Sequence, residues 1–132
     1  MNILILLARL VLGLIFTLAA LNGLLHVFPM PPKPALATQF MGLLDATHYM
    51  VPVFALQLIG GLLLLSNRFV PLALAILAPI LVNILLFHLL MDRNGALPGI
   101  VATLCSIALF QRHRRAFAPL FHATARPAPA AS

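Results

Sequence analysis

The feature that most constrains this chain is an apolar run of nineteen residues without a charged side chain, Leu10–Phe28. A helix of about twenty apolar residues crosses the hydrocarbon core of a bilayer, because each residue rises about 1.5 Å. A cleavable signal peptide has a shorter apolar segment and a small-x-small cleavage site, and the run fits neither property. We therefore interpret it as a retained transmembrane helix.

The composition of the whole chain supports a membrane environment. Of 132 residues, 63% are hydrophobic and 8% are charged, and the mean hydropathy is +1.11. Soluble domains are about half apolar and about 25% charged, so this composition excludes a soluble globule and a disordered chain. The single cysteine, Cys105, excludes an internal disulfide and a dithiol redox motif.

Three further apolar segments predict an all-α, integral membrane four-helix bundle. Pro71 falls in the first turn of the third span, where a missing N–H is tolerated. Pro79 lies inside that span, where we expect it to kink the helix and free the carbonyl of Ala75. The expected single domain covers residues 1–121, with spans at about 6–28, 47–66, 70–91 and 96–111.

The segments outside the spans have compositions of their own. Four prolines between residues 29 and 34 indicate an extended connector after the first span. Residues 35–45 then place apolar side chains at helical spacing, which predicts a short amphipathic helix in the first outer loop. This helix is a docked loop element or a lid over a cavity, and the first interpretation is the simpler. The basic tail 122–132, rich in Ala and Pro, is predicted to be disordered.

The basic residues predict the orientation in the membrane. With four spans, one side carries six arginines, and the other side carries only Lys33 and Arg93. Because basic residues concentrate in cytoplasmic loops, both termini are expected inside the cell, in a bacterial plasma membrane. The bilayer, rather than nucleic acid, is then the anionic partner. The expected lipid head-group contacts are Arg9, Arg68, Arg112, Arg114 and Arg115, and Arg126 is the sixth arginine of this side.

Three amide side chains are expected near the middle of the bilayer, on three different spans. Helical geometry places Asn22, Gln57 and Asn83 within roughly 5 Å of the midplane. Polar groups at this depth must find a partner or line a cavity. The three amides therefore form either an interhelical hydrogen-bond layer or the path of a small neutral solute.

A second polar group lies toward the outer side. His26 and His88 are expected at one level, about 10 Å from the midplane, and His48, Tyr49 and Asp92 lie near the same surface. Imidazoles at one level can hold the head group of a quinone or ligate a haem. These five residues form the candidate ligand site, with quinone or haem as the cofactors considered. No metal site is predicted.

Several stretches match a known family in order and spacing. They are Arg68-Phe69-Val70-Pro71-Leu72-Ala73, Ala78-Pro79, Val82-Asn83-Ile84-Leu85-Leu86-Phe87-His88, then Asp92, Gly95 and Pro98, with Arg9-Leu10, Asn22-Gly23 and Gly60-Gly61 before them. On these residues the chain resembles the DoxX family of small bacterial membrane proteins, from about Arg9 to Phe121. The resemblance implies a four-helix membrane protein associated with quinone-linked respiratory oxidoreductases. Related sequences often carry Glu at the position of Gln57, so this chain lacks their midplane acid.

These observations leave three functions open. The first is an accessory subunit of, or partner to, a respiratory or quinone-linked membrane oxidoreductase. It requires no catalytic activity, and the sequence offers no nucleophile–base pair and no phosphate-binding loop. The alternatives are a small quinone- or haem-binding redox protein that uses the outer histidines, and a small-solute transporter. The expected partners are lipid and either other membrane subunits or further copies of the chain.

Overall fold

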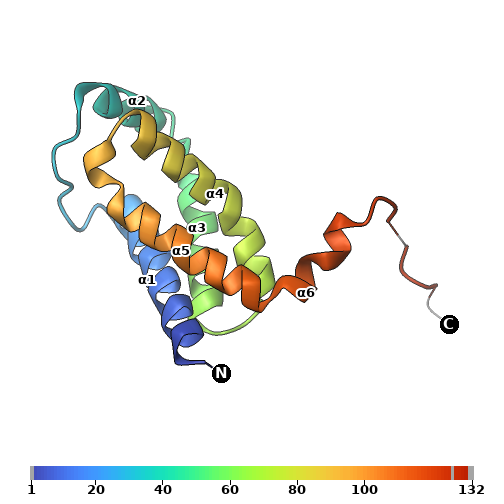
Figure 1. The fold of residues 1–132 in the computed structure, drawn as a ribbon. Coiled ribbons are helices and arrows are strands. Elements are labelled where there is room, and N and C mark those ends of the chain that lie inside the picture. Colours follow the sequence, from blue (N-terminus) through green and yellow to red (C-terminus); the bar gives the residue numbers. More distant parts are fainter. Residues whose placement is uncertain (1, 126, 131–132) are drawn as a thin grey trace.

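The computed structural model describes residues 2–125 and 127–130, and these residues form helices and loops without a strand. Arg126 and residues 131–132 of the predicted tail lie outside the described residues. The other residues after Phe121 have no helix or strand. The elements are α1 (Ile3–Leu25), α2 (Ala35–Ala46), α3 (Met50–Leu65), α4 (Val70–Leu90), η1 (Arg93–Gly95), α5 (Leu97–Arg112), α6 (Arg114–Phe117) and η2 (Ala118–Phe121), as Figure 1 shows.

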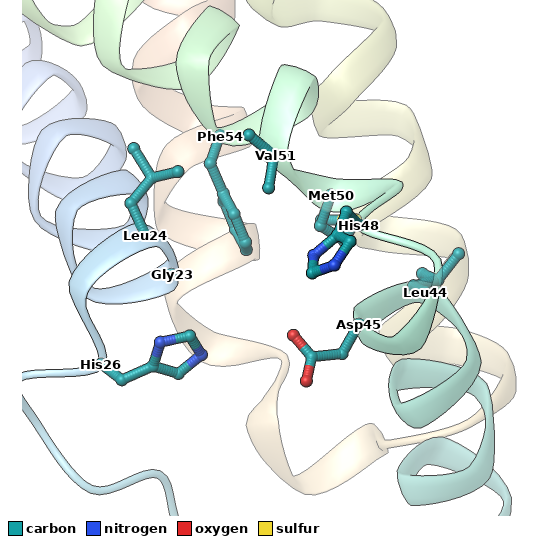
Figure 2. Close-up of a pocket in the computed structure, with 9 residues that line it drawn as sticks. All are labelled: Gly23, Leu24, His26, Leu44, Asp45, His48, Met50, Val51 and Phe54. Carbon is teal, nitrogen blue, oxygen red and sulfur yellow. The ribbon is translucent and has the colours of Figure 1, made fainter.

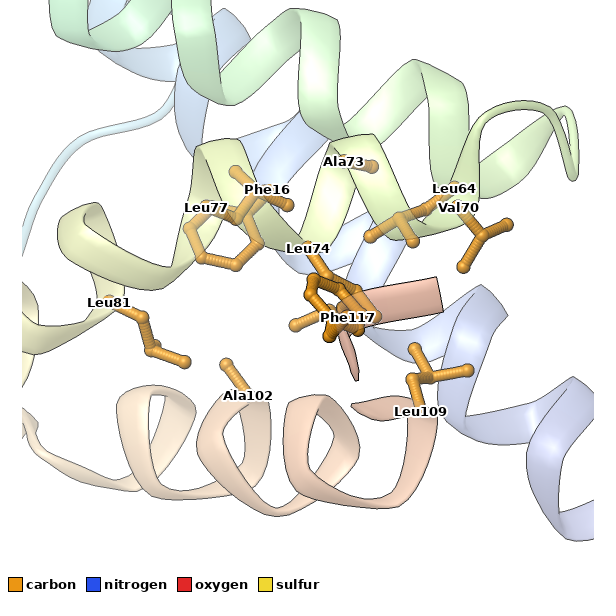
Figure 3. Packing of buried hydrophobic residues seen from close by; sticks show 11 residues of the cluster. Phe16, Leu64, Val70, Ala73, Leu74, Leu77, Leu81, Ala102, Leu109 and Phe117 are labelled. Carbon is orange, nitrogen blue, oxygen red and sulfur yellow. The ribbon is translucent and has the colours of Figure 1, made fainter. Parts of the chain in front are cut away.

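Four helices pack around one apolar core. Helix α1 contacts α3 and α5, and α4 contacts the same two helices. Every large side chain that is fully buried comes from one of these four helices. Figure 3 shows most of the core, which consists of Leu12, Phe16, Leu64, Val70, Ala73, Leu74, Leu77, Leu81, Ala102, Leu109 and Phe117.

The outward faces of these helices are also apolar. Leu18 on α1, Ile59 on α3 and Leu104 on α5 are about half exposed or more, and they are three of many such side chains. Helices α1 and α4 have 23 and 21 residues and are long and apolar enough to cross a membrane. Helices α2 and α3 meet at 92° and count as a third span only if the bent pair is taken together. The structure thus contains two or three helices that could span a membrane.

Small residues set the contact between α1 and α3. A Cβ atom added at Gly61 would collide with Thr17 Oγ1 and lie 3.0 Å from the carbonyl oxygen of Gly13. A Cβ atom at Gly13 would in turn lie 3.2 Å from the carbonyl oxygen of Gly61. The two backbones therefore touch at this point, as expected where lipid provides no hydrophobic drive between helices.

Candidate ligand site at the connector end of the helices

A recess of about 210 Å³ opens where α1 ends, α2 ends and α3 begins. We call this the connector end, because the segment 26–34 leaves α1 here. The opposite end, which carries the N-terminus and the α3–α4 loop, is the basic end (Figure 1). Figure 2 shows the lining of the recess, which consists of Gly23, Leu24, His26, Leu44, Asp45, His48, Met50, Val51 and Phe54.

Asn22 shapes the first wall of the recess. Its side-chain oxygen accepts the backbone N–H of Phe28 at 2.7 Å, and its backbone oxygen accepts the N–H of His26 at 2.8 Å. His26 takes a left-handed conformation with φ of 54°. These bonds end α1 at Leu25, three residues before the predicted end of the first span. The same turn places the His26 side chain at the recess.

The turn between α2 and α3 forms the second wall. The N–H of His48 donates to the carbonyl oxygen of Asp45 at 3.1 Å, and that of Tyr49 donates to Leu44 at 3.0 Å. His48 is again left-handed, with φ of 56°. This tight turn places the Asp45 carboxylate and the His48 imidazole at one opening, whereas Tyr49 is exposed and does not line the recess.

The floor of the recess is apolar. Leu24, Val51 and the ring of Phe54 form it, and Figure 2 shows the ring lying against Gly23. A Cβ atom at Gly23 would fall inside the contact distance of that ring, so only glycine leaves room for it. The recess therefore combines an apolar floor with a polar rim, which is the usual arrangement of a small-molecule site.

Of the residues that the structure describes, those at the rim carry one carboxylate and two imidazoles, and no lysine or arginine. Among the described residues, the one ion pair joins Lys33 to Asp92, so no lysine or arginine pairs with Asp45. The two imidazoles, His26 and His48, are the titratable groups that share the opening with this carboxylate. A neutral imidazole has one N–H donor and one nitrogen acceptor, and a carboxylate only accepts. The rim can therefore both donate hydrogen bonds to a ligand and accept them from it.

His88 and Asp92 belong to a separate cluster. His88 Nδ1 lies 3.0 Å from the carbonyl oxygen of Asp92, and since a carbonyl only accepts, Nδ1 carries the proton. The Asp92 carboxylate is buried and lies 3.8 Å from Lys33 Nζ, which ties the connector to the α4–α5 loop. Neither residue lines the recess. Of the five predicted site residues, the structure therefore brings together His26 with His48, and His88 with Asp92.

The three amides do not form a layer. Asn22 organises the end of α1, as described above. Gln57 is buried among the helices, and Asn83 is exposed on α4, where its Nδ2 donates to the carbonyl oxygen of Pro79 at 2.9 Å. The predicted depths ignore the direction of each side chain around its helix. Asn83 points away from the core that Leu77 and Leu81 enter, so it cannot meet Gln57.

Arg9 is a correction to the predicted set of head-group contacts. Its side chain is 7% exposed, and Nη1 donates to the carbonyl oxygens of Leu64 at 2.5 Å and Leu65 at 3.3 Å. The last carbonyls of a helix lack helical donors and carry the negative end of its dipole, so a cation is stabilised there. Arg9 thus ties α1 to the end of α3. The other four arginines of the prediction, Arg68, Arg112, Arg114 and Arg115, are exposed.

Sequence reasoning missed Asp45 and Thr17. Asp45 closes the predicted amphipathic segment, and its only sequence signal is a carboxylate three residues before His48. Thr17 is buried at the α1–α3 contact, and its hydroxyl has no hydrogen-bond partner among the described residues. No signal in the sequence marks Thr17, because its role follows from the close approach of Gly61.

Neither a metal centre nor a known relative identifies the ligand of the recess. Among the described residues, no group of three His, Cys, Asp or Glu side chains is arranged to hold a metal ion. No protein-family model, curated protein or solved structure matches the chain. The resemblance to the DoxX family therefore stays a prediction, and the recess and the apolar surface are the features that bear on function.

Proposed function

We propose that this chain is a multi-pass protein of the bacterial plasma membrane whose recess holds the head group of a quinone, as a non-catalytic partner of a membrane oxidoreductase. The observation that carries the proposal is the recess itself, with a rim of His26, Asp45 and His48 over an apolar floor. The fold supports it by presenting an apolar exterior on all four packed helices.

The proposed topology has four crossings, by α1, α3, α4 and α5. Helices α3 and α5 have 16 residues each, about 24 Å at 1.5 Å per residue, which is short for a hydrocarbon core of about 30 Å. They pack along α1 and α4, which are long enough, and share one core with them. A local thinning of the bilayer accommodates such short helices at modest cost.

The proposed orientation follows from the charges at the two ends. Arg68 lies in the α3–α4 loop, Arg112 ends α5, and Arg114 and Arg115 begin α6. The α3–α4 loop and the end of α5 lie on the same side as the N-terminus (Figure 1). The connector end carries Lys33 and Arg93. A cytoplasmic basic end places the recess at the outer face of the membrane.

The size and chemistry of the recess favour a quinone head group. At about 210 Å³ it is smaller than the roughly 300–1,000 Å³ of sites that enclose a whole drug-sized ligand. It fits one ring, while an attached isoprenoid tail stays in lipid. Quinone carbonyls accept hydrogen bonds from the imidazoles, and quinol hydroxyls donate to Asp45. The Phe54 ring offers a surface for aromatic contact.

The accessory role rests on what the site lacks and on the resemblance to the DoxX family. The polar side chains of the recess are a carboxylate and two imidazoles, which bind and orient a head group and exchange protons with it but do not transfer electrons. Electron transfer then belongs to the partner oxidoreductase. The two haem ligands expected from the sequence, His26 and His88, lie in different clusters, which disfavours that haem site.

A binding measurement on the purified protein tests the ligand. We expect a short-chain quinone to bind the protein in mild detergent, detected by the change in its ultraviolet absorption. His48→Leu should weaken binding about threefold to tenfold, as expected for the loss of one hydrogen bond. His122→Leu is the matched control, because His122 is exposed and lies after η2, outside the recess. Equal affinity in all three proteins rejects the quinone site.

A labelling measurement tests the topology separately. In a Cys105→Ser background, Ser66→Cys and Asn94→Cys each place one thiol in a loop, at the basic end and at the connector end respectively. An impermeant maleimide added to intact cells should label Asn94→Cys and leave Ser66→Cys unlabelled. The reverse pattern, or a protein in the soluble fraction, overturns the proposed orientation or the membrane location.

A further inference from the structure

We infer that two copies of this chain associate in the membrane through the outward face of α4, with Asn83 of each copy hydrogen-bonded to Asn83 of the other. The inference rests on the proposed membrane location but not on the quinone site. It assigns a partner to a polar side chain that the folded chain leaves on its lipid-facing surface.

Asn83 is the first observation. It lies in the interior of a 21-residue apolar helix, and its side chain is exposed. One amide N–H donates to the carbonyl oxygen of Pro79, which leaves the second N–H and the amide oxygen without a partner among the described residues. Lipid chains cannot supply that partner, so a polar group on this surface is costly unless another helix covers it.

Pro79 provides a second and independent observation on the same face. Proline has no N–H, so the carbonyl of Ala75, one turn earlier, loses its regular helical donor. Ala75, Ala78 and Pro79 are exposed and small, and they lie on one stripe with Asn83 and Leu86. A second helix can therefore approach closely here, and its Cα–H groups can contact the freed carbonyl.

The surface beside Asn83 is also hollowed. A groove of about 150 Å³ lies between α2 and α4, with Phe40 on one side and Asn83, Leu86 and Leu90 on the other. A cavity of about this volume holds a benzene-sized group. One apolar side chain from a second helix would fill the groove next to the amide.

A second copy is the occupant that fits this face best. All copies insert in the same orientation, so a two-fold axis along the membrane normal brings both Asn83 side chains to the same depth. An amide both donates and accepts, so two of them form a reciprocal pair. A two-fold interface uses the same patch on both subunits, which such a self-complementary group satisfies. An unrelated helix would need its own polar group at this depth.

Cysteine cross-linking in native membranes tests the interface. The background is Cys105→Ser, which removes the native thiol of α5. Val82→Cys places a thiol on the inferred face, and Leu104→Cys places one on α5; the native side chains are 56% and 63% exposed. We expect mild oxidation to give a product of twice the monomer mass for Val82→Cys and none for Leu104→Cys.

Each other outcome overturns a defined part of the inference. Equal cross-linking at Leu104→Cys, or none at Val82→Cys, rejects α4 as the interface. A product of any other mass rejects a second copy as the occupant. If the protein is found outside the membrane fraction, the proposed membrane location is overturned as well. If it is found in the membrane fraction but does not cross-link, only the dimer is rejected.

Two substitutions at Asn83 test the hydrogen bond. Because the side chain is exposed, Asn83→Leu leaves the packed core in place. We expect Asn83→Leu to weaken the dimer about threefold to twentyfold in detergent micelles, the range of measured interhelical polar contacts. Asn83→Gln, which keeps an amide at this position, should retain most of the affinity between the two copies. Equal dissociation constants for the three proteins overturn the amide pair.

Discussion

The two ends of the α1–α3 pair are built in different ways. Toward the basic end the backbones touch through Gly13 and Gly61, and the guanidinium of Arg9 reaches the last carbonyls of α3. At the connector end the Phe54 ring lies between the helices against Gly23, and the recess opens beside it. The two helices are thus in backbone contact at one end, and an aromatic ring lies between them at the other. The difference indicates that the basic end holds the helix pair together, whereas the connector end provides the space for a ligand.

The largest expected effect comes from a methyl group at the backbone contact. Gly61→Ala would force the new Cβ against Thr17 and the carbonyl oxygen of Gly13, and the backbone atoms there cannot move aside. We expect a loss of about 3 kcal/mol in the free energy of unfolding, measured by denaturant titration in micelles.

Gly42→Ala is the matched control for this substitution. Gly42 lies inside α2, and a Cβ atom there meets nothing within 4 Å. The change should stabilise the helix by up to about 1 kcal/mol, because alanine has the higher helix propensity. A Gly61→Ala protein as stable as Gly42→Ala would show that the helices do not touch at this point.

The second effect concerns the cation at the same end. Arg9→Met removes the charged donor from the carbonyl oxygens of Leu64 and Leu65, of which that of Leu64 keeps the backbone N–H of Asn67 at 3.2 Å. We expect a loss of about 2 kcal/mol by the same titration, as for hydrogen bonds to a charged group. Arg68→Met, which removes an exposed arginine of the neighbouring loop, should change stability by less than about 0.5 kcal/mol. Equal losses would mean that Arg9 acts through general charge rather than by capping α3.

The helices could be predicted from the sequence, but much of the site could not. Uncharged apolar runs and proline positions locate α1, α3, α4 and α5, because lipid demands helices of a given length. The helical rise per residue predicts only the depth of Asn22, Gln57 and Asn83 in the membrane. The direction of each side chain around its helix depends on how the helices pack, which one sequence does not reveal. Asn22 caps a turn and Asn83 faces outward for this reason.

The histidines show the same division. His26 and His48 line one recess because each follows a helix in a left-handed turn, and those turns depend on local hydrogen bonds that periodicity does not encode. His88 and Asp92 are four residues apart, and their contact joins the imidazole to the Asp92 backbone carbonyl just beyond the end of α4. The spacing of His88 and Asp92 is visible in the sequence, whereas the contacts between helices needed the structure.

A third substitution tests the connector end directly. Gly23→Ala would displace the Phe54 ring, which can rotate, so we expect a smaller loss of about 1–2 kcal/mol in stability. The displaced ring would enter the recess, and the affinity for a short-chain quinone should fall with it. The double variant Gly23→Ala with Phe54→Leu should recover stability. If the double variant recovers stability but neither variant changes the quinone affinity, the Phe54 ring is not part of the ligand site.

The smallest effect is expected at the second cluster of the connector end. Lys33 Nζ and Asp92 Oδ2 are 3.8 Å apart, and the lysine side chain is one-fifth exposed. Lys33→Gln should cost about 1 kcal/mol, the upper end for an ion pair near the surface, because it leaves the buried Asp92 carboxylate without its cation. High salt should reduce this effect only in part. Because neither residue lines the recess, quinone affinity should stay at the value of the unchanged protein. A fall in affinity as large as that of His48→Leu would mean that the two clusters act as one site, since the connector that carries Lys33 begins at His26.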